Sequence, residues 1–158
     1  MKNMKSVLYS IVVVLLATAL INCGGTKKTA QAPTDLIKSY IAKHETMVDS
    51  SLVNLYIKAE QDKMTNLIND TIAAKKEEGS LDALQHATFD LSGLQIEILG
   101  EAEDYVNDEI TQFMKVAVKG SYTIDLDGSA QAMTANETII LEKEGGAWKI
   151  TETLNPWT

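Results

Sequence analysis

Apolar and polar positions follow three different patterns along the chain. An uninterrupted apolar run covers residues 6–21, apolar positions recur at steps of three and four over residues 34–78, and from about residue 93 they alternate with polar positions. A period of 3.6 residues is that of an amphipathic helix, and a period of two is that of a half-buried strand. This order predicts an α+β domain in which N-terminal helices cover one face of an antiparallel sheet.

Two helices are predicted between residues 34 and 78, a stretch that contains neither Gly nor Pro. The tripeptide Asp49-Ser50-Ser51 separates them, because these residue types favour a helix break followed by a new N-cap. Gly79 ends the second helix, and residues 80–84 predict a short third one. The apolar stripes of the two long helices contain Leu36, Ile37, Tyr40, Ile41, His44, Met47 and Val48, then Leu52, Leu55, Tyr56, Ala59, Met64, Leu67, Ile68 and Ile72.

Four antiparallel strands are predicted after residue 93. Asn107-Asp108, Asp127-Gly128 and Gly145-Gly146 have the composition of tight hairpin turns and connect them into a meander. Gly120 interrupts the inward parity of the longest strand, which indicates a bulge or a bend there. The inward positions of the two central strands are Met114, Val116, Val118, Tyr122 and Ile124, and Met133, Ala135, Glu137, Ile139 and Leu141.

The apolar run at the N-terminus has the features of a secretory signal. Lys2 and Lys5 precede it, no charge interrupts it, and its length of about sixteen residues is below the ~20 that span a bilayer. The sequence Leu20-Ile21-Asn22-Cys23 follows and resembles the lipobox of bacterial lipoproteins, with Asn22 where the family usually has a small residue. The resemblance implies a diacylglyceryl group on the thiol of Cys23 and cleavage before that residue.

Two alternatives remain for this segment: a plain signal peptide that leaves Cys23 unmodified, and an uncleaved N-terminal anchor. Cys23 is the only cysteine in the chain. It cannot form an internal disulfide, and an exported protein seldom keeps a free thiol, so lipidation is the favoured interpretation. The predicted organisation is a signal peptide over residues 1–22, a lipidated cysteine with a flexible tether over 23–33, and one domain over 34–158. We expect a cell-envelope location facing the periplasm or the exterior, with the lipid held in a membrane.

The charge of the mature chain restricts its partners. Residues 23–158 contain twelve Lys, no Arg and twenty-two acidic residues, a net charge of −10. Arg supplies the planar fork that best recognises phosphates and base edges. Nucleic acid is therefore not an expected partner, and an anionic membrane surface would repel the domain.

A family resemblance concerns the end of the domain. Two helices followed by strands that end in Glu142-Lys143-Glu144-Gly145-Gly146-Ala147-Trp148-Lys149-Ile150 resemble the nuclear transport factor 2-like superfamily over about residues 34–153. The resemblance implies a cone of curved four-stranded antiparallel sheet around a long N-terminal helix. The superfamily includes ketosteroid isomerases and polyketide cyclases as well as binding modules, so the fold by itself does not decide the function.

Four residues are candidates for lining a pocket. Tyr40 and His44 lie one turn apart on the first helix, and together with Tyr122 they could supply polar groups to a cavity; ordinary amphipathic packing is the alternative. Glu137 has inward parity, and a desolvated glutamate beside a pocket can serve as a base with a raised pKa; the alternative is that solvent hydrates it. No metal site or cofactor is expected, because His86 lacks neighbouring ligands and the loop at Asp125 lacks the later ligands of a calcium loop.

Three functions fit these observations. The first is a non-enzymatic envelope lipoprotein that binds a small apolar ligand or another protein, and this is the one we expect. The second is a structural or surface interaction protein without a pocket, and the third is a small enzyme of isomerase or cyclase type. A hollow cavity with an inward carboxylate would favour ligand binding or catalysis. An interior filled by Met, Leu and Tyr side chains would favour an interaction role.

Overall fold

The computed structural model describes residues 31–157, so the leader, Cys23 and most of the predicted tether lie outside the described range. Within that range, no helix has both the length and the apolar character needed to cross a membrane. The elements, in chain order, are α2 (Pro33–His44), the 3-10 helix η1 (Ser50–Leu55), α3 (Lys58–Glu77), α4 (Leu81–Gln85), β1 (Thr88–Asp90), β2 (Leu94–Val106), β3 (Glu109–Leu126), β4 (Ser129–Glu144) and β5 (Ala147–Thr151).

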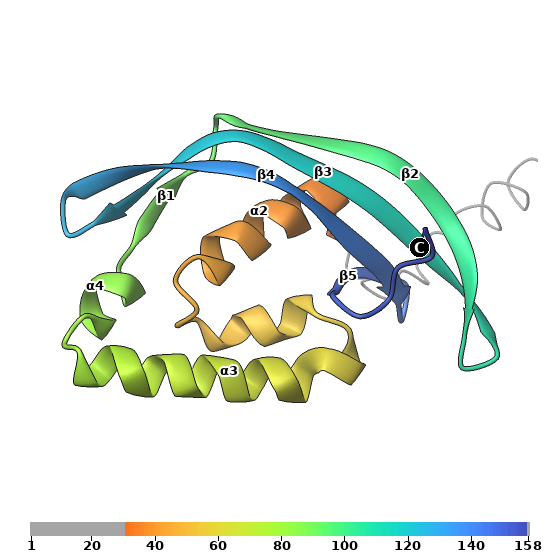
Figure 1. The fold of residues 1–158 in the computed structure, drawn as a ribbon, viewed down its shortest axis with the longest axis horizontal. Coiled ribbons are helices and arrows are strands. Elements are labelled where there is room, and N and C mark those ends of the chain that lie inside the picture. Colours follow the sequence, from red (N-terminus) through yellow and green to blue (C-terminus); the bar gives the residue numbers. More distant parts are fainter. Residues whose placement is uncertain (1–30, 158) are drawn as a thin grey trace, which may run out of the picture.

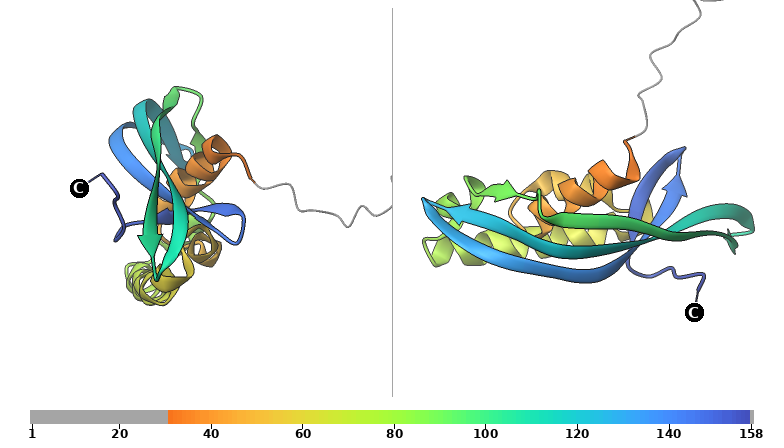
Figure 2. Two further views of the ribbon diagram at one scale, coloured as in Figure 1. Left: turned by 90° about the vertical axis from the view of Figure 1, so that its right-hand side faces the viewer. Right: turned by 90° about the horizontal axis from the view of Figure 1, so that it is seen from above.

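The strands form one curved antiparallel sheet with β3 near its centre. β3 pairs with β4 without interruption from Phe113 opposite Glu142 to Leu126 opposite Ser129. On its other side it pairs with β2 and, further along, with β1. The sheet arches over α2 and η1, and α3 lies beneath them (Figure 1 and Figure 2). The predicted α+β arrangement is therefore confirmed, as a curved sheet that does not close into a barrel.

The sheet has five strands and not the four that were predicted. The three residues of β1 were missed because a segment this short carries too little alternation to register as a strand. A turn separates β1 from β2, which pair with the same side of β3, and in this turn the backbone of Gly93 approaches that of Gly120 on β3. A Cβ built on Gly120 would lie 2.3 Å from the carbonyl oxygen of Gly93, and the φ of Gly120 is +117°. The bend predicted at Gly120 is thus a close backbone approach that only glycine permits.

The second predicted helix is divided in two, contrary to the prediction from its uninterrupted apolar stripe. Tyr56 and Ile57 are extended between η1 and α3, and Tyr56 forms an isolated parallel bridge with Ile150 of β5. The backbone N–H of Ile57 donates to the carbonyl oxygen of Ile150 at 3.0 Å. The buried residues of α3 are Glu60, Met64 and Ile68, and Leu67 is exposed although the predicted stripe placed it inside. A tertiary contact has overridden local helical preference.

The break predicted at Asp49 is confirmed, and so is the short helix α4. Asp49 is the N-cap of η1, where its Oδ1 accepts a hydrogen bond from the backbone N–H of Ser51 at 2.8 Å. The first helix begins at Pro33, the last residue of the predicted tether. Proline suits this position because the first N–H groups of a helix have no partner within it.

One contiguous core lies between the helices and the inner face of the sheet. The side chains of α2, η1 and α3 pack directly against β3, β4 and β5 in a single cluster under the arch. The buried members of this cluster are Leu36, Ile37, Tyr40, Ile41, Leu52, Tyr56, Met64, Ile68, Met114, Val116, Val118, Tyr122, Ile124, Ala135, Ile139, Leu141 and Ile150.

Candidate functional site

The structure brings the four predicted pocket residues to one region between α2 and β4. The rings of Tyr40 and His44 are in contact, with their centroids 4.8 Å apart. The hydroxyl of Tyr122 on β3 donates to the carboxylate of Glu45, the residue after His44. Glu137 on β4 is close enough to the Tyr40 and Tyr122 hydroxyls to act on both electrostatically. The four residues are therefore on neighbouring elements, although Glu137 is exposed and not desolvated as its strand parity predicted.

A fifth residue of this region, Tyr56, was assigned in the sequence only to apolar packing. Its side chain is completely buried, and its hydroxyl donates to Oε1 of Glu152 at 3.3 Å. It also shares a hydrogen bond with Tyr40, and the two rings meet edge to face with centroids 6.1 Å apart. The signal that could have revealed this role is the tyrosine itself within a predicted apolar stripe, because a hydroxyl buried there needs a hydrogen-bond partner.

The three tyrosine hydroxyls are held in the protonated state. Burial raises the pKa of Tyr40 to about 12, and the carboxylates of Glu137, Glu152 and Glu45 act in the same direction, against the opposing effect of the hydrogen bond with Tyr56. Burial also raises the pKa values of Tyr56 and Tyr122. These hydroxyls are neutral, and each has a partner within the fold: Tyr56 and Tyr122 donate to carboxylates, and Tyr40 shares a hydrogen bond with Tyr56.

Glu137 does not have the desolvated environment expected of a general base. Its side chain is exposed, although its partner across the sheet, Val118, is completely buried. β5 pairs with β4 only from Ile140 onwards, so Glu137 lies where the edge of β4 is uncovered and water reaches it. It borders an open groove of about 290 Å³ whose other lining residues are Tyr40, Thr138, Ile139, Ile140, Ile150, Thr151, Glu152, Leu154 and Asn155.

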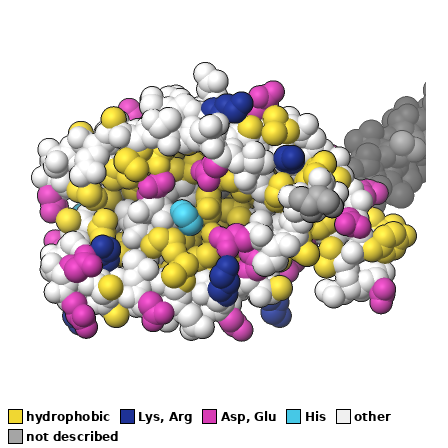
Figure 3. Space-filling view, in the orientation of Figure 1, with side chains coloured by type: hydrophobic (Ala, Val, Ile, Leu, Met, Phe, Trp, Pro, Cys, Tyr) yellow, Lys and Arg dark blue, Asp and Glu magenta, His cyan; other side chains and the backbone are white. Residues whose placement is uncertain are grey.

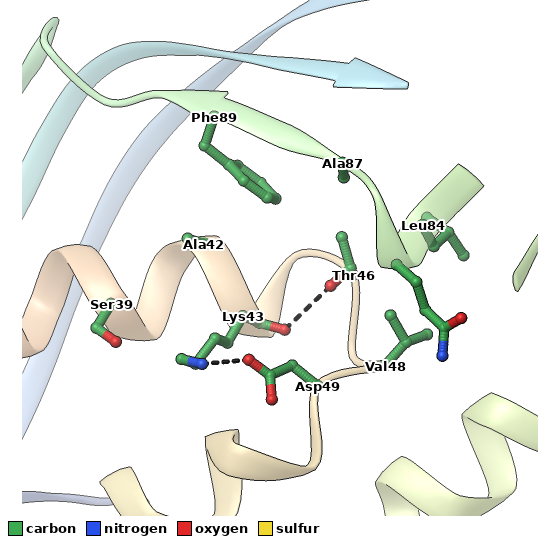
Figure 4. Close-up of a pocket in the computed structure, with 10 residues that line it drawn as sticks. Ser39, Ala42, Lys43, Thr46, Val48, Asp49, Leu84, Ala87 and Phe89 are labelled. Atoms are coloured by element: carbon green, nitrogen blue, oxygen red, sulfur yellow. Dashed lines mark hydrogen bonds and ion pairs between the residues drawn. The ribbon is translucent and has the colours of Figure 1, made fainter. Parts of the chain in front are cut away.

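A second open groove lies between α2, α4 and β1 and has a volume of about 450 Å³ (Figure 4). Lys43 and Asp49 form an ion pair on one wall, and Lys43 also donates to the hydroxyl of Ser51. Phe89 and Ala87 lie opposite, on and beside β1. The groove is open to solvent and mixes apolar with polar groups; its lining residues are Ser39, Ala42, Lys43, Thr46, Val48, Asp49, Leu84, Gln85, Ala87 and Phe89.

Two buried glutamates that sequence reasoning missed lie at the junction of α3, β4 and β5. Glu60 is only 6% exposed, and its carboxylate accepts hydrogen bonds from Thr151, Glu152 and Thr153. Burial by itself would raise the pKa of Glu60, but these hydrogen bonds outweigh it and hold the pKa below the ordinary value. Glu60 therefore connects the first turn of α3 to the segment after β5 in its ionised form.

Glu142 is in the opposite situation. It is 8% exposed, and within residues 31–157 its Oε2 atom is buried without a hydrogen-bond partner. Burial raises the pKa of this carboxyl group, and the neighbouring carboxylates of Glu144 and Glu60 raise it further. Sequence alternation could not identify either glutamate, because the burial of each depends on the chain that packs over it.

Large apolar side chains are also exposed, and most of them lie on β2 and β3. Figure 3 shows hydrophobic side chains at the end of the molecule where the β2–β3 hairpin projects, with acidic side chains beside them. The exposed large apolar residues are Leu67, Ile98, Leu99, Tyr105 and Ile110. A pair such as Tyr105 and Ile110, adjacent across two strands, offers more apolar contact than scattered single residues do.

Within residues 31–157 the structure contains no group of three or more His, Cys, Asp or Glu side chains that could hold a metal ion. His86 lies near Asp82, with Nδ1 and Oδ1 3.5 Å apart, and its Nδ1–H donates a hydrogen bond to the Asp82 carbonyl oxygen at 2.9 Å. Asp125 accepts a hydrogen bond from the backbone N–H of Gly128, so its side chain stabilises the turn between β3 and β4.

Comparison of the sequence with known proteins adds no assignment: no family model matches the chain, and no curated protein matches it.

Proposed function

We propose that this chain is a bacterial cell-envelope lipoprotein, lipidated on Cys23, whose domain is a non-enzymatic module that binds a protein partner. The domain is assigned to the nuclear transport factor 2-like cones. Support for this assignment comes from the motif at residues 142–150, from the order of helices and strands, and from the arched sheet around the N-terminal helices.

The observation that carries the proposal is the continuous packing between the helices and the sheet. Side chains of α2, η1 and α3 pack in one cluster against the sheet, and the hydroxyls of Tyr40, Tyr56 and Tyr122 are engaged within the fold. Large apolar side chains remain on the outside instead, on β2 and β3 above all. Apolar surface that is exposed beside charged groups is typical of protein-binding surfaces.

The lipid anchor is tested by labelling living cells with an alkyne-bearing fatty acid and measuring the intact mass of the membrane-extracted protein. We expect label on the native chain, cleavage before Cys23, and loss of both label and membrane association in Cys23→Ser. An unlabelled, full-length chain in the cytosol would contradict the proposal.

The kind of partner is tested by native mass spectrometry of the detergent-extracted protein, together with chemical cross-linking in intact cells. We expect the mass of the lipidated chain without an added small molecule, and cross-links to another protein. A stoichiometric small-molecule adduct that survives purification would instead establish a ligand carrier.

A second candidate function is binding of a small amphipathic ligand in the groove between α2, α4 and β1. Its volume of about 450 Å³ is within the range of small-molecule sites, and it combines Phe89 and Val48 with the Lys43–Asp49 ion pair. A neutral apolar dye such as Nile red provides the test. If this candidate is correct, Phe89→Ala should lower the affinity for the dye. Leu67→Ala, on the exposed face of α3, should leave that affinity unchanged.

A further inference from the structure

The hairpin between β2 and β3 extends beyond the rest of the sheet. Residues 103–106 of β2 pair with residues 109–112 of β3, whereas the pairing of β3 with β4 begins only at Phe113. Residues 103–112 are therefore a two-stranded projection, visible at the end of the sheet that carries β5 (Figure 1). We call residues 101–112 the β2–β3 arm.

The tip of the arm presents an apolar pair. Tyr105 is 72% exposed and Ile110 is 63% exposed, and the two are directly opposite each other across the strands. The turn at Asn107 and Asp108 fixes this pairing, because both residues have positive φ, as a two-residue hairpin turn requires. By strand parity the pair lies on the same face as the buried Met114.

The base of the arm is attached to the body of the sheet by a row of side chains. Lys143 on β4 donates to Oε1 of Gln112 at 2.9 Å, and Gln112 donates to Oε1 of Glu103 at 3.3 Å. The Nζ atom of Lys143 also lies 5.5 Å from the centre of the Trp148 ring on β5. This row crosses all four strands at that level, so the apolar tip is held on an anchored projection.

The charge of the arm is of one sign only. Residues 101–112 contain five acidic side chains and no lysine, and all five are exposed: Glu101, Glu103, Asp104, Asp108 and Glu109. The described domain as a whole contains ten lysines and twenty-two acidic residues, a net charge of −12. A second copy of the chain would bring like charges against the arm, and the phosphates of an anionic membrane or a nucleic acid would do the same.

We propose that the β2–β3 arm is the docking surface of the domain and that its occupant is a protein with a Lys- and Arg-rich surface around an apolar pocket, into which Tyr105 and Ile110 insert. This inference rests on the proposed function and names the chemistry of the partner. Tyrosine is enriched among the residues that dominate binding energy, and a surrounding set of complementary charges accelerates association and fixes the orientation.

Defined peptides test the chemistry with the purified full-length lipoprotein in detergent micelles. The first peptide combines Lys with Leu and Trp; the second replaces every Lys with Glu; the third keeps Lys and replaces Leu and Trp with Ser. We expect the first to bind at least ~10-fold more tightly than the other two, with an affinity that falls as salt is added. Equal affinity for the first and second peptides would overturn the proposal.

Matched variants locate the binding. The double variant Tyr105→Ser/Ile110→Ser should weaken binding of the first peptide about 10- to 100-fold, whereas Leu67→Ser, which removes an exposed apolar residue from α3, should not. Glu101→Gln/Glu109→Gln should reduce the salt dependence, whereas Asp70→Asn/Glu77→Gln on α3 should leave it unchanged. Circular dichroism confirms that each variant is folded. An arm variant that is folded and binds normally overturns the proposal.

Photo-cross-linking in living cells distinguishes failure of this inference from failure of the proposed function. The photoreactive residue p-benzoylphenylalanine is placed at position 110, 67 or 134, one position in each variant. An adduct from position 110 with a protein whose contacting segment is Lys- and Arg-rich is the expected result. Adducts with a second copy or with lipid, or protein adducts from positions 67 or 134 alone, overturn the arm as docking surface while a protein-binding role stands. If no position yields a protein adduct, the proposed function itself is overturned.

Discussion

The carboxylate of Glu60, in the first turn of α3, accepts hydrogen bonds from both the backbone N–H and the hydroxyl of Thr153, at 3.1 and 2.7 Å. The hydroxyl of Thr151 and the backbone N–H of Glu152 donate to the same carboxylate. One side chain thus holds the segment after β5 against the start of a helix that is about ninety positions away in the chain. The stability of this junction should depend on Glu60 more than on any exposed residue of α3.

Replacing Glu60 with Ala should destabilise the domain by about 2–3 kcal/mol. The buried N–H groups of Glu152 and Thr153 would lose their acceptor, and hydrogen bonds to a charged group are among the more costly to remove. Urea unfolding followed by circular dichroism at pH 7 measures the change. Asp62→Ala, an exposed position two residues further along α3, serves as the control and should change the stability by less than about 0.5 kcal/mol.

The contribution of Glu60 should depend on pH in a defined direction. Its pKa is lower in the folded state, so its stabilisation is complete above the unfolded-state pKa near 4.5 and is lost as the pH falls through the lower folded-state pKa. The difference in unfolding free energy between the wild type and Glu60→Gln should therefore shrink below pH 4.5. A difference that is constant from pH 7 to pH 3 would contradict this account.

Replacing Glu142 with Gln should stabilise the domain at neutral pH, because the substitution removes a buried charge that lies beside other carboxylates. Burial and two neighbouring carboxylates raise the pKa of Glu142, so its ionised form is the unfavourable one in the folded state. The wild type should approach the stability of the variant below the unfolded-state pKa and fall behind it as the pH rises. Thermal unfolding between pH 4 and pH 8 tests this trend, with the exposed Glu137→Gln as the control.

Replacing Gly120 with Ala should destabilise the domain by about 2 kcal/mol or more. The new Cβ would lie 2.3 Å from the backbone oxygen of Gly93, and the φ of +117° is one that side chains rarely adopt. Gly100→Ala is the matched control, because an added Cβ there has open space around it. Equal effects of the two substitutions on the urea midpoint would show that the approach of Gly93 to Gly120 is not what requires the glycine.

Tyr122→Phe should cost about 1 kcal/mol, the usual net value of one hydrogen bond, because the hydroxyl of Tyr122 joins β3 to Glu45 after α2. The double-mutant cycle with Glu45→Gln measures the coupling between the two residues. A coupling energy of zero would indicate that the hydrogen bond adds nothing to the joining of helix and sheet.

The sequence by itself determined the order of the helices and the four long strands, the hairpin turns, and most of the inward positions of β3 and β4. It did so because helices and strands repeat with different periods, and because turns at Asn107-Asp108 and Asp127-Gly128 have residue preferences of their own. Tyr40, Tyr122 and Glu137 were placed on facing elements by the same local rules. The predictions of export and of lipidation on Cys23 also come from the sequence alone, because signals of this kind are short linear segments.

Only the tertiary structure decided the features that depend on contacts between distant segments. Tyr56 and Ile57 are extended and not helical because they bond to Ile150 of β5. Glu60 and Glu142 are buried because residues after β5 and neighbouring strands cover them. The exposure of Glu137 follows from the short length of β5. Each of these features depends on a surface that is covered, or left uncovered, by residues far away in the sequence. The local pattern of apolar and polar residues contains no information about such contacts.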